Sequence, residues 1–274
     1  MNATTKRTLS DEQIADFERD GFLAVRNFLA KEEVDEIRNC FMAVNAEGPV
    51  PGLSEIGAHY RPEDPLSFYP RMMHPHRHPE LPVGPLAMKY MLYAKVGETL
   101  NDLFGEEAVA VQSMFYFKPP GARGQELHQD NYYLRVKPGT CMAAWLAVDD
   151  ADEENGGMMV VPGSHDQDIS CPEKADPAVS FTGDYVQVPE GREKTPCNLK
   201  AGDMLFFNGS VIHGSTPNLS PDRFRRAFIC HYVPISTAEM SHHYKPKFDF
   251  AGRDIDMPDN PDGGPCGVMD VGVH

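Results

Sequence analysis

The chain has 274 residues, of which 41% are hydrophobic and 24% are charged, a balance typical of an ordinary globular protein. Its formal net charge of -16 argues against nucleic acid or an anionic membrane surface as a partner. We find no apolar stretch of transmembrane length and no apolar signal core behind the first residues. The six cysteines lack paired spacing, so we expect reduced cysteines in a cytoplasmic protein.

The length suits one domain over 1–274, with a helical opening over 1–47. Ser10 and Gln13 form a capping-box pattern, which predicts a helix that stops near Gly21. A short strand is expected at 22–25. Apolar residues recur on one face of 31–46 and predict a second helix there. We expect these helices to buttress a sheet.

Residues 47–84 contain repeated prolines, which break regular structure. A long irregular segment inside a compact domain is often a binding loop, so this stretch is a candidate lid. Its histidines His74, His76 and His78 could suggest a metal site. Because no carboxylate or cysteine is spaced to complete one, we favour a solvated loop.

A helix is predicted over 86–103, and strands follow it. The expected strands are 109–118, a strand through His128, 141–148, 158–161, 185–188, 203–207 and 226–233. Short strands separated by turns, without intervening helices, indicate a mainly β jelly-roll core over 108–234. For the polar tail, 235–274, a loose arm, an active-site cover and an oligomer contact all stay open.

A candidate metal site begins at His128 and Asp130. Two residues apart on an extended strand, these side chains would point to the same side. An imidazole and a carboxylate suit a divalent first-row metal, above all non-heme iron(II). His213, just past an apolar run, is the best third ligand, and the three would leave three coordination positions open. Taken alone, a His-x-Asp pair more often marks a hydrogen-bonded histidine at a strand edge than a metal site. The surrounding motifs must therefore decide between the two interpretations.

Several motifs follow one another between Ser10 and Pro234. They are Lys118-Pro119-Pro120-Gly121, Leu127-His128-Gln129-Asp130, Ala144-Trp145, Asn155-Gly156-Gly157, Val161-Pro162-Gly163-Ser164-His165, Ala201-Gly202-Asp203, His213-Gly214-Ser215 and Arg225-Arg226-Ala227. In this order they resemble the phytanoyl-CoA dioxygenase family of iron(II)/2-oxoglutarate oxygenases. The resemblance implies a double-stranded β-helix, a cupin-like jelly-roll with the metal near one mouth. It also implies His128, Asp130 and His213 as the iron ligands.

The resemblance places 2-oxoglutarate against Arg225, Ser215, Trp145 and Met114. The far carboxylate of this cosubstrate needs a desolvated cation that can bind it through two hydrogen bonds. On a strand, Arg225 and Arg226 face opposite ways, so only one points inward. The family pattern favours Arg225, and Arg226 stays an alternative. Without the resemblance, Trp145 and Met114 would be read as core residues and Ser215 as a turn cap.

The resemblance implies a dioxygenase that uses iron(II), 2-oxoglutarate and O2. Such an enzyme would hydroxylate a C–H bond of a small organic substrate and release succinate and CO2. The carboxylate of Asp130 argues against a halogenase, which leaves that position vacant for chloride. Two alternatives are a cupin-type metalloenzyme that uses no 2-oxoglutarate and a non-catalytic binding protein on the same scaffold.

The substrate is expected to be small and polar or natural-product-like. The acidic chain disfavours an acyl-CoA, and the signature of ectoine hydroxylases around the iron histidine is absent. Residues near the motif, and some in the candidate lid, are candidate substrate contacts. They are Arg123, Gln125, Gln129, Asn131, Tyr132, His59 and Arg71. His165 is expected to order its loop.

Overall fold

The structure is a computed structural model that describes residues 7–56, 61–260 and 266. Its α-helices are α1 (Asp11–Asp20), α2 (Lys31–Ala46), α3 (Val83–Met91), α4 (Ala94–Phe104) and α5 (Asn131–Leu134). Its strands are β1 (Phe22–Val25), β2 (Met72–Met73), β3 (Ala108–Tyr116), β4 (Gln125–His128), β5 (Met142–Ala147), β6 (Met158–Val160), β7 (Glu173–Lys174), β8 (Asp184–Tyr185), β9 (Thr195–Cys197), β10 (Met204–Asn208), β11 (His213–Ser215) and β12 (Ala227–Pro234). Short 3-10 turns are η1 (Pro65–Ser67), η2 (Pro75–Arg77), η3 (Ser164–Asp166) and η4 (His242–Tyr244).

The N-terminal helices confirm their sequence signals. The Ser10 hydroxyl accepts from the Gln13 amide at 3.2 Å, and the Gln13 side chain accepts from the Ser10 amide at 3.0 Å. Gly21, at φ 80°, ends α1. The helix predicted over 86–103 is instead two helices, because Leu92 leaves the helical conformation and Tyr93 is extended before α4.

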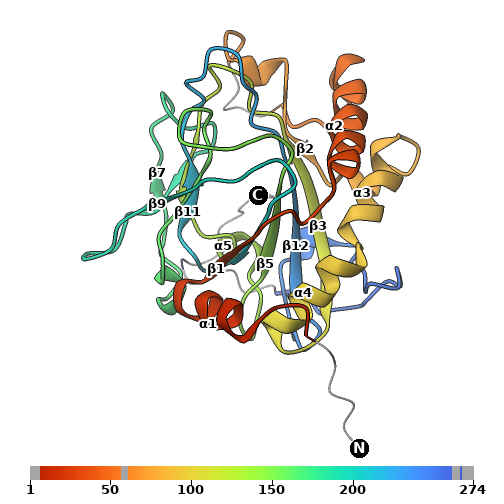
Figure 1. Ribbon diagram of the computed structural model, residues 1–274, viewed down its shortest axis with the longest axis vertical. Helices are drawn as coiled ribbons and strands as arrows, with labels where there is room; N and C mark the ends of the chain where they lie inside the picture. The colour runs from red at the N-terminus through yellow and green to blue at the C-terminus, as the bar shows by residue number, and fades with distance from the viewer. Residues whose placement is uncertain (1–6, 57–60, 261–265, 267–274) are drawn as a thin grey trace, which may run out of the picture.

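Two antiparallel sheets form the body of the molecule (Figure 1). The larger sheet has the order β1-β10-β5-β12-β3-β2, and the smaller has the order β4-β11-β6-β9. Strands β7 and β8 pair separately. The sheets are not closed into a barrel, but the arrangement confirms the predicted mainly β jelly-roll.

Helices α2, α3 and α4 cover the outer face of the larger sheet (Figure 1). Phe41 of α2 stacks on Phe115 of β3, with 4.1 Å between ring centroids. Because strand residues alternate between faces, the neighbours Met114 and Tyr116 of β3 point to the opposite side, into a second core between the sheets. That inner layer holds the candidate site.

The candidate lid segment has more order than its sequence suggests. Strand β2 lies inside this segment and pairs with β3. Residues 57–60, which include His59, lie outside the described residues. His74 and His76 are only 6% and 5% exposed, so the expectation of a solvated loop is wrong for both. The imidazole of His76 lies 2.7 Å from the Ser113 hydroxyl on β3, which draws it into the interior.

The expectation of six reduced cysteines is also wrong. Cys171 and Cys266 form a disulfide with 5.5 Å between their Cα atoms. The bond joins the insertion after β6 to the C-terminal tail, positions far apart in sequence that spacing alone could not pair. Cys40, Cys141, Cys197 and Cys230 are free thiols, and all but Cys40 are buried.

The described part of the tail packs on the domain. Phe248 and Ala110 exchange backbone hydrogen bonds of 2.7 and 2.9 Å, and Met240 and Tyr244 are fully buried. A loose arm is therefore excluded as far as residue 260.

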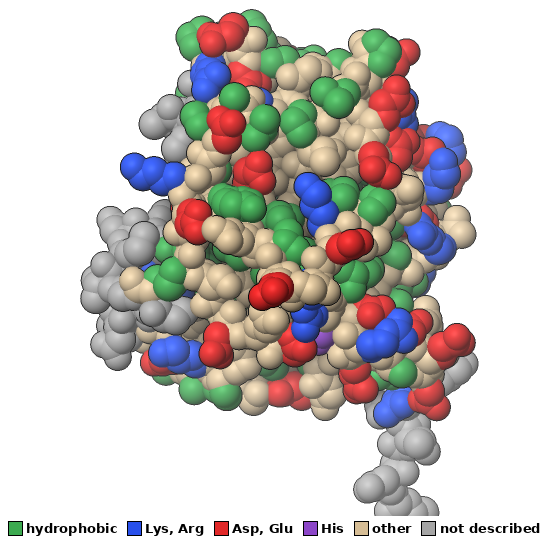
Figure 2. All heavy atoms as spheres, turned by 90° about the vertical axis from the view of Figure 1, so that its left-hand side faces the viewer, with side chains coloured by type: hydrophobic (Ala, Val, Ile, Leu, Met, Phe, Trp, Pro, Cys, Tyr) green, Lys and Arg blue, Asp and Glu red, His purple; other side chains and the backbone are tan. Residues whose placement is uncertain are grey.

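The surface carries both signs of charge. On the face beside β7, β9 and β11, acidic and basic side chains are interspersed (Figure 2). Within the described ranges, we find no helix that is both long enough and apolar enough to cross a membrane.

Candidate metal centre and cosubstrate pocket

Three predicted ligands meet between the two sheets. Strands β4 and β11 pair so that His128 lies opposite His213, and Asp130 follows β4 by two residues. The Nε2 atoms of His128 and His213 lie 3.6 and 3.5 Å from Oδ1 of Asp130. One ligand atom from each of the three residues lies within 4.8 Å of the others, and all three side chains are buried.

Both histidines have their outer ring nitrogen fixed by the backbone. Nδ1 of His128 lies 2.8 Å from the Glu126 carbonyl, and Nδ1 of His213 lies 2.9 Å from the Val211 carbonyl. A carbonyl oxygen only accepts, so each Nδ1 carries a proton and each Nε2 is the ring atom left to bind a metal. Burial lowers the pKa of His128 to about 3, and His213 adds to this effect. His128 is therefore neutral at physiological pH, as a metal ligand must be.

Asp130 reaches the site differently from the prediction. Its backbone has φ -61° and ψ -36°, so it stands past the end of β4, at the start of α5, and not on an extended strand. Burial alone would raise the pKa of Asp130, but the imidazoles of His213 and His231 hold it well below its usual value. The carboxylate is thus ionised and suited to a divalent cation.

A cavity with an empty volume of about 370 Å³ surrounds this cluster. The larger sheet contributes Met114, Tyr116, Trp145, Phe207, Ile229 and His231 to its wall. The smaller sheet contributes Gln125, His128, Met158, His213, Gly214 and Ser215, and the remaining lining residues are Asp130 and Arg225. The structure therefore brings together all seven predicted ligand and cosubstrate residues around one cavity.

Arg225 and Arg226 point in opposite directions. Arg225 is 1% exposed, lines the cavity and has its guanidinium 5.4 Å from the centre of the Trp145 ring. Arg226 pairs with Asp149 outside the cavity at 2.7 Å. Burial lowers the pKa of Arg225 to about 10, which still leaves it charged at neutral pH. Its Nη1 has no hydrogen-bond partner among the described residues, so the buried cation offers a free donor to the cavity.

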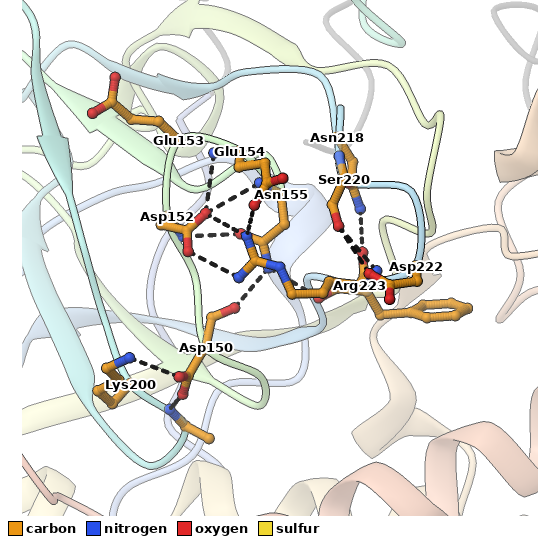
Figure 3. A network of polar contacts seen from close by, with 12 residues as sticks. Asp150, Asp152, Glu153, Glu154, Asn155, Lys200, Asn218, Ser220, Asp222 and Arg223 are labelled. Atoms are coloured by element: carbon orange, nitrogen blue, oxygen red, sulfur yellow. Dashed lines mark hydrogen bonds and ion pairs between the residues drawn. The ribbon is translucent and has the colours of Figure 1, made fainter.

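A polar network holds the chain just before Arg225, around Arg223 (Figure 3). Arg223 donates to both carboxylate oxygens of Asp152 at 2.9 Å and to Glu154 at 2.6 Å. The Asn155 amide donates to the carbonyl of Phe224 at 3.1 Å. The loop between β5 and β6 is thereby tied to the segment before β12, which fixes Arg225 in position.

Most of the candidate substrate contacts do not line the cavity. Among the members of that set that the structure describes, which exclude His59, only Gln125 is in its wall, with its amide nitrogen 3.2 Å from Nε2 of His128. Arg123 pairs with buried Asp64, and Arg71 pairs with Glu55 and donates to the Tyr116 hydroxyl at 2.9 Å.

The remaining candidates also serve the fold. The Gln129 side chain joins Ser170 and Ser210 backbone groups at 2.8 Å each. Asn131 accepts from the Val136 amide at 3.0 Å, and Tyr132 packs in the core beside Tyr133. His165 lies 3.2 Å from the Glu18 carbonyl, in agreement with a loop-ordering role.

The sequence reasoning missed His231 and Lys118. His231 lines the cavity from β12. Every second residue of a strand faces the same side, so continuing that alternation from Arg225 along the chain would have pointed to His231. Lys118 stands two residues past the end of β3, with a positive φ of 37°, and is 2% exposed. Its side chain contacts Ser215 at 2.7 Å. Lysines are rarely so buried, and only the three-dimensional contacts reveal this one.

A jelly-roll with two imidazoles and one carboxylate in a buried cavity defines a mononuclear non-heme metal enzyme. The sequence profile of the family described as Phytanoyl-CoA dioxygenase (PhyH) matches residues 17–227. The chain belongs to this family and is an iron(II)/2-oxoglutarate-dependent dioxygenase.

Relatives agree with this assignment. The chain is 28% identical to "Phytanoyl-CoA dioxygenase domain-containing protein 1 homolog" of Dictyostelium discoideum, over 82% of this chain and 91% of that one. It is 26% identical to "Phytanoyl-CoA dioxygenase 1" of Oryza sativa subsp. japonica, over 85% and 92% of the two chains.

Solved structures share the fold. The non-heme α-ketoglutarate-dependent carbocyclase SnoK from nogalamycin biosynthesis superposes with a TM-score of 0.66 at 21% identity, covering 84% of this chain and 86% of SnoK. EctD from S. alaskensis, solved with 2-oxoglutarate and 5-hydroxyectoine, gives a TM-score of 0.64 at 20% identity, covering 86% and 80% of the two chains.

Proposed function

We propose that His128, Asp130 and His213 hold iron(II) and that the enzyme hydroxylates an unactivated C–H bond of a small organic substrate. In this proposal, 2-oxoglutarate places its far carboxylate on Arg225, beside Ser215, Trp145 and Met114. The products are the hydroxylated substrate, succinate and CO2. The protein would act on a small molecule in the cytoplasm, not on nucleic acid or at a membrane.

The buried guanidinium of Arg225 is the observation that carries the proposal. An isolated charge in a protein interior costs several kcal/mol unless a partner offsets it. The described residues supply Arg225 with one backbone acceptor, the Gly156 carbonyl at 3.0 Å, and leave Nη1 without a partner. A carboxylate delivered by a cosubstrate satisfies that requirement, and Trp145 beside the guanidinium excludes water from the contact.

The chemistry itself belongs to the bound groups. Iron(II) and 2-oxoglutarate, when bound, supply an oxidative decarboxylation in which one atom of O2 enters succinate and the other enters the substrate. The protein fixes the two imidazoles in the tautomer that faces the metal and orients the Asp130 carboxylate. Met114 and Phe207 give the cavity apolar walls, which would limit the access of water to the reacting groups.

The lining of the cavity supports a substrate with an apolar reacting group. Met158, Phe207 and Ile229 offer apolar contacts, while Tyr116 and Gln125 offer hydrogen bonds. Because the cosubstrate would share this cavity, the proposal takes a small molecule, or the end of a larger one, as the substrate.

The test is turnover of 2-oxoglutarate. Purified protein with iron(II) and O2 is expected to form succinate, at a rate that rises when a panel of amines, amino acids, phosphonates and acyl-CoAs contains the substrate. With ¹⁸O2, the product is expected to gain one labelled oxygen. A protein that oxidises a substrate without consuming 2-oxoglutarate would be a cupin-type metalloenzyme of another kind. One that binds iron and 2-oxoglutarate but never forms succinate would be a non-catalytic binding protein.

A further inference from the structure

Lys118 lies behind the wall of the cosubstrate pocket, next to the residues that face it. Its Nζ lies 2.7 Å from the Ser215 hydroxyl and 3.1 Å from the Gly156 carbonyl, and it also contacts the Thr216 carbonyl. The Gly156 carbonyl accepts from Arg225 Nε as well, at 3.0 Å. One backbone oxygen therefore connects Lys118 to the buried guanidinium.

The three neighbours of Nζ match the three hydrogens of an ammonium group. Two of them are carbonyl oxygens, which can only accept, and the third is the Ser215 hydroxyl. When Nζ donates to Ser215, the hydroxyl oxygen acts as the acceptor and its own hydrogen must point elsewhere. Ser215 lines the cavity, so that hydrogen is free to turn toward a ligand there.

The charge balance around Lys118 also calls for an anion. Lys118 is 2% and Arg225 is 1% exposed, and neither side chain forms an ion pair with a carboxylate among the described residues. Burial, with Arg225 adding to it, lowers the pKa of Lys118 well below its usual value. A carboxylate placed between Ser215 and Arg225 would offset both charges.

We propose that Lys118 is a positioning residue of the cosubstrate pocket, which orients the Ser215 hydroxyl and the Gly156 carbonyl around the far carboxylate of 2-oxoglutarate. Lys118 acts through these two groups and does not itself contact the cosubstrate. This inference rests on the proposed function.

Binding measured without turnover tests the proposal. We compare wild type, Lys118→Met and Lys118→Arg, each loaded with Mn(II) under anaerobic conditions, by calorimetry. The Met variant keeps an unbranched side chain that is one atom shorter, and it removes the donors. We expect its Kd for 2-oxoglutarate to rise by at least tenfold, with Mn(II) affinity unchanged. The Arg variant, which keeps charge and donors in another geometry, should recover part of the loss.

A ligand lacking the far carboxylate separates positioning from general damage. 2-Oxopentanoate keeps the keto-acid end and replaces the far carboxylate with a methyl group. We expect wild type and Lys118→Met to bind it within twofold of one another. In the iron enzyme, the variant should raise KM for 2-oxoglutarate more than it lowers kcat.

A double-mutant cycle checks the route through Ser215. If Lys118 acts by orienting that hydroxyl, Lys118→Met should raise the Kd for 2-oxoglutarate by a clearly smaller factor in a Ser215→Ala background than in wild type. Equal losses of 2-oxoglutarate and 2-oxopentanoate binding, or a 2-oxoglutarate Kd within twofold of wild type in a folded variant, would overturn the proposal. If the Met variant does not fold, Lys118→Gln is judged by the same criteria. A wild-type protein that binds no 2-oxoglutarate would instead refute the proposed function.

Discussion

His231 donates a hydrogen bond from Nε2 to Oδ2 of Asp130 across 2.9 Å, and both side chains are 1% exposed. Because the carboxylate is ionised, the imidazole must be the donor. The other oxygen, Oδ1, faces the two histidines of the metal site. His231 therefore leaves Oδ1 as the oxygen that Asp130 would offer to a metal, and coordination positions would remain for cosubstrate and O2.

Replacing His231 is expected to weaken the metal site. His231→Phe should reduce affinity for Mn(II) by about 10- to 100-fold, because the carboxylate loses the partner that orients it. His231→Gln, which keeps an N–H donor, should retain more of the affinity. Calorimetry with Mn(II) measures both effects, and equal affinities for the Phe variant and wild type would refute the orienting role.

The three proposed metal ligands should be indispensable. His213→Ala removes one imidazole of the site, and we expect metal affinity and succinate formation to fall by at least about 100-fold. His165→Ala is the matched control, because His165 contacts the Glu18 carbonyl away from the cavity. Succinate release over time measures activity, and full turnover by the His213 variant would end the assignment.

Arg225 and Arg226, adjacent in the segment just before β12, provide a matched pair. Arg225→Gln is expected to raise KM for 2-oxoglutarate on the order of 100-fold, because a buried charged hydrogen-bond partner is worth about 2–5 kcal/mol. Arg226→Gln loses only the pair with Asp149 outside the cavity and should leave that KM unchanged. Steady-state kinetics with varied 2-oxoglutarate separates the two. The reverse result would make Arg226 the anchor.

The buried histidines of the candidate lid predict an acid-sensitive fold. Burial lowers the pKa of His74 to about 2 and that of His76 to about 3, against an ordinary value near 6.5. As pH falls below about 6.5, the unfolded chain takes up protons that the folded chain does not. Each histidine therefore lowers the free energy of unfolding by roughly 1.4 kcal/mol per pH unit until its folded pKa is reached.

Urea unfolding of the metal-free protein at pH 7 and pH 5 measures this loss. His76→Asn removes one of the two titrating groups and keeps a polar side chain beside Ser113. We expect this variant to lose less stability than wild type over the same interval. Identical losses would show that His76 does not stay neutral in the folded protein.

Much of the fold follows from local signals. The capping box at Ser10, the apolar face of α2 and the spacing of short strands predicted the N-terminal helices and the jelly-roll. The failures have physical causes. Tyr93 is extended between two helical stretches with continuous apolar periodicity, and the disulfide pairs two cysteines that are 95 residues apart in the chain.

The site shows the same division. Imidazole and carboxylate side chains are recognisable as metal ligands from residue type alone. His128, Asp130 and His213 could therefore be chosen from the sequence, and the structure brings them close together. The substrate candidates were chosen for nearness in sequence to His128, and most of them turned out to hold the fold. Lys118 and His231 depend on contacts across strands, which one-dimensional spacing does not encode.

The loop between β5 and β6 also limits which sequence changes this protein tolerates. Connecting loops usually accept insertions readily. Here the Gly156 carbonyl accepts hydrogen bonds from both Lys118 and Arg225. The φ of Gly156 is 79°, and a Cβ at this position would approach the Thr216 carbonyl oxygen to 2.6 Å. A lengthened loop would move the hydrogen-bond acceptor on which both cations depend. Loop grafting aimed at a new specificity is therefore better directed elsewhere on the scaffold.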